Sequence, residues 1–166
     1  EELLDLIVEN IPCPTGDPDG EFEALIIDSW FDAYLGVVSL IKVINGSIKQ
    51  GQKIKVYSTQ QSYLADQIGI FSPKKLPKKE LCAGQVGYMV AGIKKIQGAP
   101  VGDTVIDSKN DSAKPLPGFQ KVLPKVFASL FTVDSDDYEK FRDALSKLVL
   151  NDSALIYEPE VSDALG

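Results

Sequence analysis

The chain has 166 residues and 44% of them are hydrophobic, which is enough to build the core of one sizeable domain or two small ones. Its formal net charge of −7 argues against bulk electrostatic attraction to nucleic acid, although it leaves room for local basic patches. The sequence contains no histidine, so catalysis by imidazole is excluded and a zinc site would lack its usual nitrogen ligand.

Nothing in the sequence predicts a membrane span or a secretion signal. It contains no run of about 18 apolar residues and no charged-then-apolar leader. The two cysteines, Cys13 and Cys82, lie far apart in the sequence, which favours free thiols in a reducing compartment over a disulfide. We therefore expect a cytosolic protein.

Residues 1–10 carry leucine, isoleucine and valine side chains at helical spacing on one face, which predicts a helix. No N-cap residue precedes this pattern, so we expect the helix to be the last part of something longer. Residues 11–20 contain three prolines and two glycines. This composition predicts a linker at a domain boundary.

Residues 22–57 predict a β-meander. Over residues 24–29, Ala24, Ile26 and Asp28 alternate with Leu25, Ile27 and Ser29. Residues 37–44 are rich in the β-branched side chains that strands favour. The Asn45-Gly46 pair favours a type I′ hairpin turn, and a third strand is expected at residues 53–57. Further short strands are expected at residues 63–71, 81–93 and 101–106.

Residues 21–107 as a whole are expected to form one mainly β domain. Strands this short, spaced by roughly ten residues with no helix between them, indicate a small closed antiparallel β-barrel. Three glycines within it, Gly84, Gly87 and Gly92, could instead form a phosphate cradle. No G-x-x-x-x-G-K-[ST] sequence occurs and no helical pattern follows these glycines, so we interpret them as turns and bulges.

Residues 108–118 form a second linker, polar and rich in proline, and the sequence pattern changes after it. Residues 126–133 predict a strand. A helix is expected next, with Asp136 as its N-cap and Glu139 as the capping-box partner. Residues 154–157 predict another strand, so this part of the chain is expected to be a β-α-β unit.

Seven lysines form two groups that are candidate contacts for nucleic-acid phosphates. Such contacts would be directed at the nucleic-acid backbone rather than at the base sequence. The first group consists of Lys49, Lys53 and Lys55, and the second of Lys74, Lys75, Lys78 and Lys79. A solvated loop that happens to be rich in lysine is the alternative interpretation of the second group.

An acidic cluster stands at the start of the predicted C-terminal helix. Its members are Asp134, Asp136, Asp137 and Glu139. These side chains could hold a hard cation or supply acid–base chemistry. Their position at a helix N-terminus, where unpaired N–H groups favour negative charge, explains them without any chemistry.

Two further clusters lie around the first predicted turn. Trp30, Phe31 and Tyr34 could form a platform on which bases stack, but packing in the core or in a hairpin is the favoured interpretation. Asp28 and Asp32 could be the paired carboxylates of a hydrolase, although a strand-turn-strand segment needs no catalytic explanation.

Six segments together resemble the LepA family of translational GTPases, also called elongation factor four. They are residues 11–17 (IPCPTGD), 28–38 (DSWFDAYLGVV), 71–74 (FSPK), 115–119 (PLPGF), 133–138 (VDSDDY) and 148–154 (LVLNDSA). The similarity spans nearly the whole chain, and its segment around Trp30 is specific. The sequence departs from the family at Cys13, where a further proline is expected, and likewise at Thr132.

This resemblance implies a division of the chain into parts of three domains. Residues 1–10 would end the last helix of a GTPase domain, and residues 11–20 would be a linker. Residues 21–107 would be the second, barrel domain of a translation factor. Residues 108–118 would be a second linker, and residues 119–166 would be a truncated third domain with a partial α+β, ferredoxin-like β-α-β unit.

The same resemblance implies a non-catalytic fragment of a ribosome-binding GTPase that remodels tRNA-bound ribosomes, through back-translocation or the fidelity of protein synthesis. The fragment would bind no cofactor, whereas the parent protein would hydrolyse GTP with magnesium. The implied partners are small-subunit rRNA, ribosomal proteins and tRNA-bound ribosomal complexes. The implied location is the cytoplasm, with peripheral association of the parent with the inner face of the cell membrane.

A stand-alone β-barrel module for protein interaction is the alternative function. In either case, the truncated third domain would leave open strand edges. Because open edges pair readily with other chains, we expect non-physiological self-association through this part of the chain.

Overall fold

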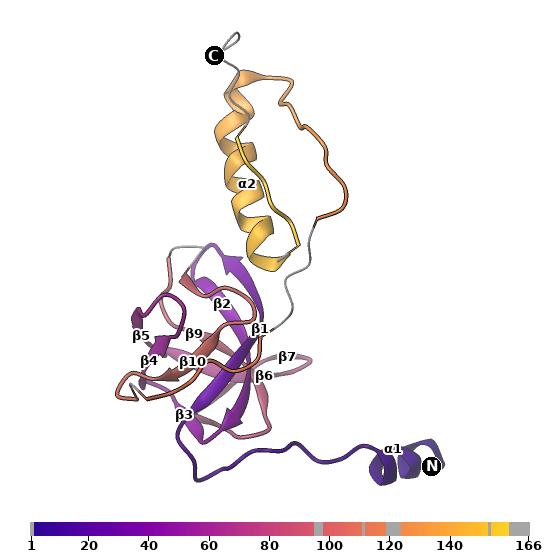
Figure 1. Ribbon diagram of the computed structural model, residues 1–166, viewed down its shortest axis with the longest axis vertical. Coiled ribbons are helices and arrows are strands. Elements are labelled where there is room, and N and C mark those ends of the chain that lie inside the picture. Colours follow the sequence, from indigo (N-terminus) through magenta and orange to yellow (C-terminus); the bar gives the residue numbers. More distant parts are fainter. Residues whose placement is uncertain (1, 95–97, 111, 119–123, 153, 160–166) are drawn as a thin grey trace.

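The computed structural model describes residues 2–94, 98–110, 112–118, 124–152 and 154–159 (Figure 1). The strands are β1 (Glu23–Asp32), β2 (Gly36–Asn45), β3 (Ser47–Lys49), β4 (Lys53–Val56), β5 (Ser62–Leu64), β6 (Gln67–Ser72), β7 (Lys74–Lys78), β8 (Glu80–Cys82), β9 (Val86–Val90) and β10 (Thr104–Asp107). The helices are α1 (Glu2–Asn10), the 3₁₀ helix η2 (Ser135–Asp137) and α2 (Tyr138–Asn151). We call residues 23–107, which contain all of these strands, the β domain.

The β domain is mainly antiparallel β structure, which confirms the fold class predicted from the sequence. One sheet has the strand order β5-β4-β10-β1-β2-β9-β6-β7, and β3 pairs with β8 in a second, two-stranded sheet. Every pair of neighbouring strands is antiparallel.

The sequence predicts a closed barrel, but among the described residues the large sheet does not close. Its two edge strands, β5 and β7, do not pair with each other. Strand β5 has only three residues. Strand β7 contains Pro77, which has no N–H group, and three lysines, and both features oppose pairing at a sheet edge. The sheet therefore curves around a core without a complete ring of hydrogen bonds.

One hydrophobic core joins most of the strands. Alternate side chains of β1 point inward, so that Ala24 and Ile26 are fully buried. Ile41 of β2 and Ile54 of β4 are fully buried as well, and Ile68 of β6 belongs to the same core. Burial of each such branched side chain stabilises the fold by about 1.5 to 3 kcal/mol.

The hairpin predicted at Asn45-Gly46 is wrong, because the strands on either side of this turn, β2 and β3, do not pair with each other. Gly46 does have a positive φ of 64°, but its N–H donates to the backbone carbonyl of Asp17, 2.7 Å away. The chain then continues into β3, which pairs with β8. The linker therefore takes the place that a returning strand would have in a hairpin.

Two predicted strands are each divided in the structure. The strand expected at residues 63–71 is β5 and β6 with a break at residues 65–66, and the one expected at residues 81–93 is β8 and β9 with a turn at residues 83–85. The turn needs Gly84, whose φ is 85°. The strand at residues 101–106 is the shorter β10.

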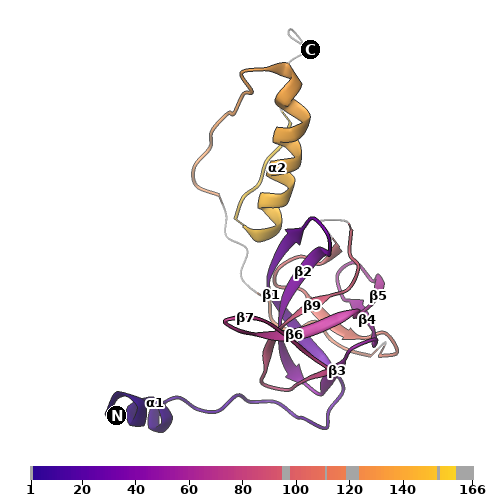
Figure 2. The ribbon, with the colours of Figure 1, turned by 180° about the vertical axis from the view of Figure 1, so that it is seen from behind.

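The C-terminal part differs most from the prediction. The expected helix is present as α2, but the strands expected at residues 126–133 and 154–157 are wrong, because these segments contain no regular secondary structure. Neither segment has a neighbouring strand to pair with among the described residues. The predicted β-α-β unit is therefore represented by a helix with two irregular flanking segments (Figure 2).

Helix α2 docks on the β domain through its last turn. Leu150 is only 5% exposed and belongs to the core of the β domain, and the Lys147 ammonium lies 5.3 Å from the centre of the Phe31 ring. Helix α1 is confirmed, and all of its described residues are exposed. None of the helices in the described part of the chain has the length and apolar character needed to cross a membrane.

Candidate nucleic-acid interface

The pairing of β3 with β8 brings together lysines from the two groups predicted in the sequence. Lys49 lies opposite Glu80, and the Gln50 N–H donates to the Lys79 carbonyl over 3.0 Å. Lys78 ends β7 immediately before this point. We call Lys49, Lys78 and Lys79 the β3–β8 lysine patch.

One carboxylate lies within this patch. The Lys49 ammonium is 3.7 Å from Glu80 Oε1, and that oxygen also accepts a hydrogen bond from Ser47 Oγ at 2.7 Å. Both side chains of the ion pair are well exposed, so the pair contributes little to stability. Glu80 orients Lys49 while leaving its ammonium accessible to an anion.

Lys53 and Lys55 lie on the outward face of β4. Their neighbours Ile54 and Val56 are fully buried, so the alternation of the strand directs the lysines away from the core. Lys53 is exposed and Lys55 is half-buried with interactions of its own. These two lysines form a second basic site on the same domain.

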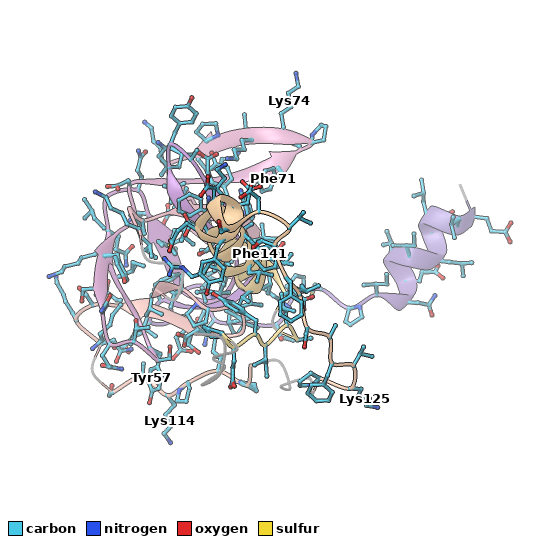
Figure 3. The ribbon with its side chains drawn as sticks, turned by 90° about the horizontal axis from the view of Figure 1, so that it is seen from above. Tyr57, Phe71, Lys74, Lys114, Lys125 and Phe141 are labelled. Atoms are coloured by element: carbon cyan, nitrogen blue, oxygen red, sulfur yellow. The ribbon has the colours of Figure 1, made fainter. Side chains whose placement is uncertain are left out.

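Lys74 and Lys75 stand near the turn of the β6–β7 hairpin, and their side chains differ in environment. The Lys74 side chain points outward from the hairpin (Figure 3). The Lys75 ammonium lies 5.9 Å from the centre of the Trp30 ring and 5.8 Å from that of Tyr88. Lys75 is therefore committed to a cation–π contact, which makes it a weaker candidate for phosphate binding than Lys74.

The three aromatic residues predicted as a cluster at the first turn lie in three different environments. Trp30 packs near Phe71 with 6.1 Å between ring centres, whereas Phe31 packs against the core. Adjacent residues of a strand point to opposite faces, which is why the two rings separate. Tyr34 is 98% exposed and lies on the rim of a hollow of about 510 Å³. Packing thus explains Trp30 and Phe31 without stacked bases.

Sequence reasoning missed two members of the aromatic contact, Phe71 and Tyr88, whose ring centres are 5.4 Å apart. Their strands pair with each other in the sheet, with Gly69 opposite Tyr88. Nothing within the sequence near Trp30 signals these partners, because they lie more than 40 positions away along the chain.

The carboxylates near the first turn have structural roles. Asp32 Oδ1 accepts hydrogen bonds from the N–H groups of Tyr34 at 2.9 Å and Leu35 at 3.1 Å. These bonds, that of Tyr34 first, hold the pKa of Asp32 below its ordinary value, and the charge of Lys75 adds a smaller effect in the same direction. Asp28 Oδ1 accepts the N–H of Ser29 at 2.8 Å. The turn therefore uses the Asp32 oxygen, whereas the Asp28 oxygen bonds within β1.

The acidic cluster of the C-terminal part is likewise explained by local structure. Asp134 Oδ1 accepts the Asp136 N–H and so caps η2, whereas α2 begins after Asp137 without a side-chain cap. The predicted capping box of Asp136 and Glu139 is therefore wrong, and Glu139 forms an ion pair with Arg142 instead. Among the described residues no group of three or more candidate ligands could hold a metal ion.

The glycines considered as a phosphate cradle serve chain geometry. Gly84 and Gly92 both have positive φ angles, of 85° and 61°. A Cβ atom on Gly87 would lie 2.4 Å from the Gly69 carbonyl oxygen, so close packing of β6 and β9 requires glycine there. Gly84 thus agrees with the interpretation as turns and bulges, whereas Gly87 lies in regular strand pairing and not in a bulge.

Residues 36–106 match the family model of elongation factor Tu domain 2. The structure is also similar to the crystal structure of a protein from Thermus thermophilus, with a TM-score of 0.73 and 24% sequence identity over 95% of this chain. The aligned part is 23% of that protein, so this chain spans about a quarter of its length. At this identity the likeness concerns the fold. The segment from β2 to β10 is therefore similar to domain 2 of elongation factor Tu, in agreement with its mainly β architecture.

Proposed function

We propose that this chain is the domain 2 region of a ribosome-binding translational GTPase of the LepA type. The observation that carries the proposal is the match of residues 36–106 to elongation factor Tu domain 2. The six segments quoted above support the assignment to LepA, and the lysines of the β domain supply a surface for rRNA phosphates.

In this proposal these 166 residues bind the ribosome, and the rest of the protein binds and hydrolyses GTP. The β domain contacts small-subunit rRNA, and also ribosomal proteins, on tRNA-bound ribosomes, which the whole factor remodels in back-translocation or in the control of fidelity. The factor acts in the cytoplasm and associates peripherally with the inner face of the cell membrane. Its GTP and magnesium bind outside these 166 residues, since they include neither a phosphate loop nor an Asn-Lys-x-Asp sequence.

The β3–β8 lysine patch and the two lysines of β4 are the proposed phosphate contacts, with Lys74 as a further one. The pairing of β3 with β8 brings Lys49 near residues that are distant from it in sequence, and all three lysines of the patch are exposed. The sequence also predicts Lys75 as a phosphate contact. Because its ammonium lies over the rings of Trp30 and Tyr88, we expect it to contribute least to direct phosphate binding.

Co-sedimentation of the 166-residue chain with small ribosomal subunits tests the proposal. We expect binding that weakens when Lys49, Lys78 and Lys79 are all changed to glutamine. A matched control changes Lys109, Lys114 and Lys140 to glutamine, which alters the net charge equally but leaves the patch intact. Titration of the chain with GTP in a calorimeter should give no binding.

Two results would count against parts of this proposal. Absence of co-sedimentation with subunits, together with capture of a protein ligand, would favour the interaction module in place of the translation factor. Equal weakening by the patch variant and by its control would show that overall charge, rather than these three lysines, governs binding.

A further inference from the structure

The β6–β7 hairpin is attached to the rest of the sheet through only one of its two strands. Among the described residues β7 pairs with β6 alone, and all five residues of β7 are exposed. Strand β6 in turn pairs with β9 over three residue pairs, those of residues 67–69. The outer half of the hairpin therefore extends beyond its pairing with the sheet, as Figures 1 and 2 show. Backbone hydrogen bonds alone leave this half free to bend.

Four side chains from four strands meet on one face of the sheet beside this hairpin. They are Trp30 of β1, Phe71 of β6, Lys75 of β7 and Tyr88 of β9, and we call them the Lys75 clasp. Phe71 lies directly opposite Lys75 in the hairpin, and its ring centre is 5.4 Å from that of Tyr88. Trp30 and Tyr88 belong to a small hydrophobic cluster that is separate from the main core. The clasp therefore lies on the outer face of the β domain.

Gly69 makes room for the clasp. It lies directly opposite Tyr88 in the pairing of β6 with β9. A Cβ atom on Gly69 would lie 2.6 Å from Tyr88 Oη and 2.4 Å from the Leu76 carbonyl oxygen. Because glycine has no side chain, the Tyr88 ring can lie across β6, near Phe71 and Lys75. Tyr88 is consequently only 2% exposed, although it lies outside the main core.

The Lys75 ammonium links the hairpin to two other strands. It lies 5.9 Å from the centre of the Trp30 ring and 5.8 Å from that of Tyr88, within the range over which an aromatic ring attracts a cation. Its charge also acts on the first turn, where two backbone N–H groups and, to a smaller extent, Lys75 lower the pKa of Asp32. A neutral side chain of similar length would keep the packing but lose these attractions.

We propose that Lys75 is a positioning residue, which fixes the β6–β7 hairpin against β1 and β9 so that Lys74 and Lys78 face the phosphates of the ligand. This inference rests on the proposed function and deepens it. Neighbouring residues of a strand point to opposite faces, so Lys74 and Lys78 share the face opposite to that of Lys75. Lys75 is thus the weakest direct phosphate contact of the hairpin, and it acts through the other two lysines.

Hydrogen exchange of the free chain, without any ribosome, provides the first test. Lys75→Met removes the charge and keeps most of the length of the side chain, whereas Lys75→Arg keeps the charge and its attraction to the rings. We expect the β7 amides to exchange about two- to tenfold faster in Lys75→Met and at an unchanged rate in Lys75→Arg. Lys74→Met is the matched control, because the Lys74 side chain points outward, and it should leave the exchange unchanged.

Fluorescence provides a second readout, because Trp30 is the single tryptophan of the chain. Lys75→Met should increase the quenching of this fluorescence by acrylamide, since the hairpin then covers the ring less. Lys75→Arg and Lys74→Met should be quenched like the unaltered chain. A residue that only fills space in the hairpin would not distinguish arginine from methionine in this way.

Binding to small ribosomal subunits separates positioning from direct contact. Trp30→Leu leaves every charge in place but removes one ring from the clasp. If Lys75 positions the hairpin, Trp30→Leu and Lys75→Met should each raise the dissociation constant at least about twofold, but by no more than the factor by which exchange accelerates. The double variant should raise it no further, because both changes release the same contact. If Lys75 bound phosphate itself, Trp30→Leu would free its ammonium and would not weaken binding.

Unchanged exchange and fluorescence in Lys75→Met would overturn the proposal, whether or not the chain binds ribosomes. So would binding that Lys75→Met weakens and Trp30→Leu does not. Failure of the unaltered chain to bind subunits would refute the proposed function and the phosphate role of the hairpin, while exchange would still decide whether Lys75 holds the hairpin. Circular dichroism of each variant, compared with the unaltered chain, verifies that the β domain remains folded.

Discussion

Gly46 and Gly51 both adopt left-handed backbone conformations, but only Gly46 is crowded. Their φ angles are 64° and 82°. A Cβ atom on Gly46 would lie 2.5 Å from the Gly20 carbonyl oxygen and 2.8 Å from the Phe22 nitrogen, whereas a Cβ on Gly51 would meet nothing within 4 Å. At Gly46 the linker and the β domain touch through their backbones, which cannot move aside as a flexible side chain can.

This difference predicts unequal effects of the same substitution. Gly51→Ala should lower the free energy of unfolding by about 1 kcal/mol, the cost of a left-handed conformation for alanine. Gly46→Ala should lower it by at least about 3 kcal/mol, because the clash with backbone atoms adds to that cost. Urea denaturation of both variants checks this, and equal effects would mean that the linker does not pack at Gly46.

Asp32 makes the stability of the first turn sensitive to acid. Its pKa is held below the ordinary value, so the folded state favours the ionised carboxylate more than the unfolded state does. The stabilisation is therefore present above the unfolded-state pKa and is lost as the pH falls through the folded-state pKa. Lys75 contributes to the effect only while it remains near the turn.

Asp32→Asn should flatten the dependence of the melting temperature on pH below about pH 4, where the unaltered chain loses this contribution. The amide retains an oxygen that can accept the two N–H groups, so the fold should persist. Thermal melts between neutral and acidic pH measure the effect. An acid dependence that is unchanged in Asp32→Asn would contradict the assignment to Asp32.

At the scale of elements, Leu150 is the buried apolar contact between helix α2 and the β domain. Leu150 is 5% exposed within the core of the β domain, whereas Leu148, two residues earlier, is 51% exposed. Helical geometry separates residues two positions apart by more than half a turn, which accounts for the contrast. Leu150 is therefore the apolar anchor of α2.

Leu150→Ala should destabilise the docked helix by about 2 to 3 kcal/mol, since it removes a buried side chain from the core. Hydrogen exchange should then show faster exchange of the α2 amides with little change in β1 and β2. Leu148→Ala is the matched control and should change the exchange of α2 by much less. Similar acceleration in both variants would mean that α2 is held by its intrinsic helix preference rather than by docking.

Sequence patterns predict those elements that local periodicity determines. The alternation of β1 and the β-branched run of β2 are both confirmed, and so is the helical period of α2. The pairing of β3 with β8 was not predictable in this way, because about 30 residues separate them and no local signal specifies the partner. Lys49 and Lys79 lie near each other only because β3 pairs with β8.

Residues 126–133 show the opposite error, in which a strong local preference is not realised. Their β-branched and aromatic side chains favour a strand, but a strand requires a partner and the described chain provides none. The same reasoning applies to Asn45-Gly46, where the turn dipeptide is present but the linker occupies the position of a returning strand. Both errors arise because β structure depends on contacts distant in the sequence.

At the scale of the whole molecule, a chain of net charge −7 groups several of its lysines on exposed surfaces of the β domain. In the C-terminal part, Asp134 caps η2, and Asp137 and Glu139 form ion pairs with Lys140 and Arg142. The β domain is thus free to present local positive charge toward phosphates in spite of the acidic whole. This separation is what the proposed ribosomal role requires.

The salt dependence of binding to small ribosomal subunits tests this account most directly. Lys49, Lys53 and Lys55 are changed together to glutamine, and the logarithm of the binding constant is plotted against the logarithm of the salt concentration. If all three contact rRNA phosphates, the variant should bind more weakly and the slope should fall in magnitude by about 2 to 3. An unchanged slope would contradict the claim that these lysines of the β domain meet the ribosome.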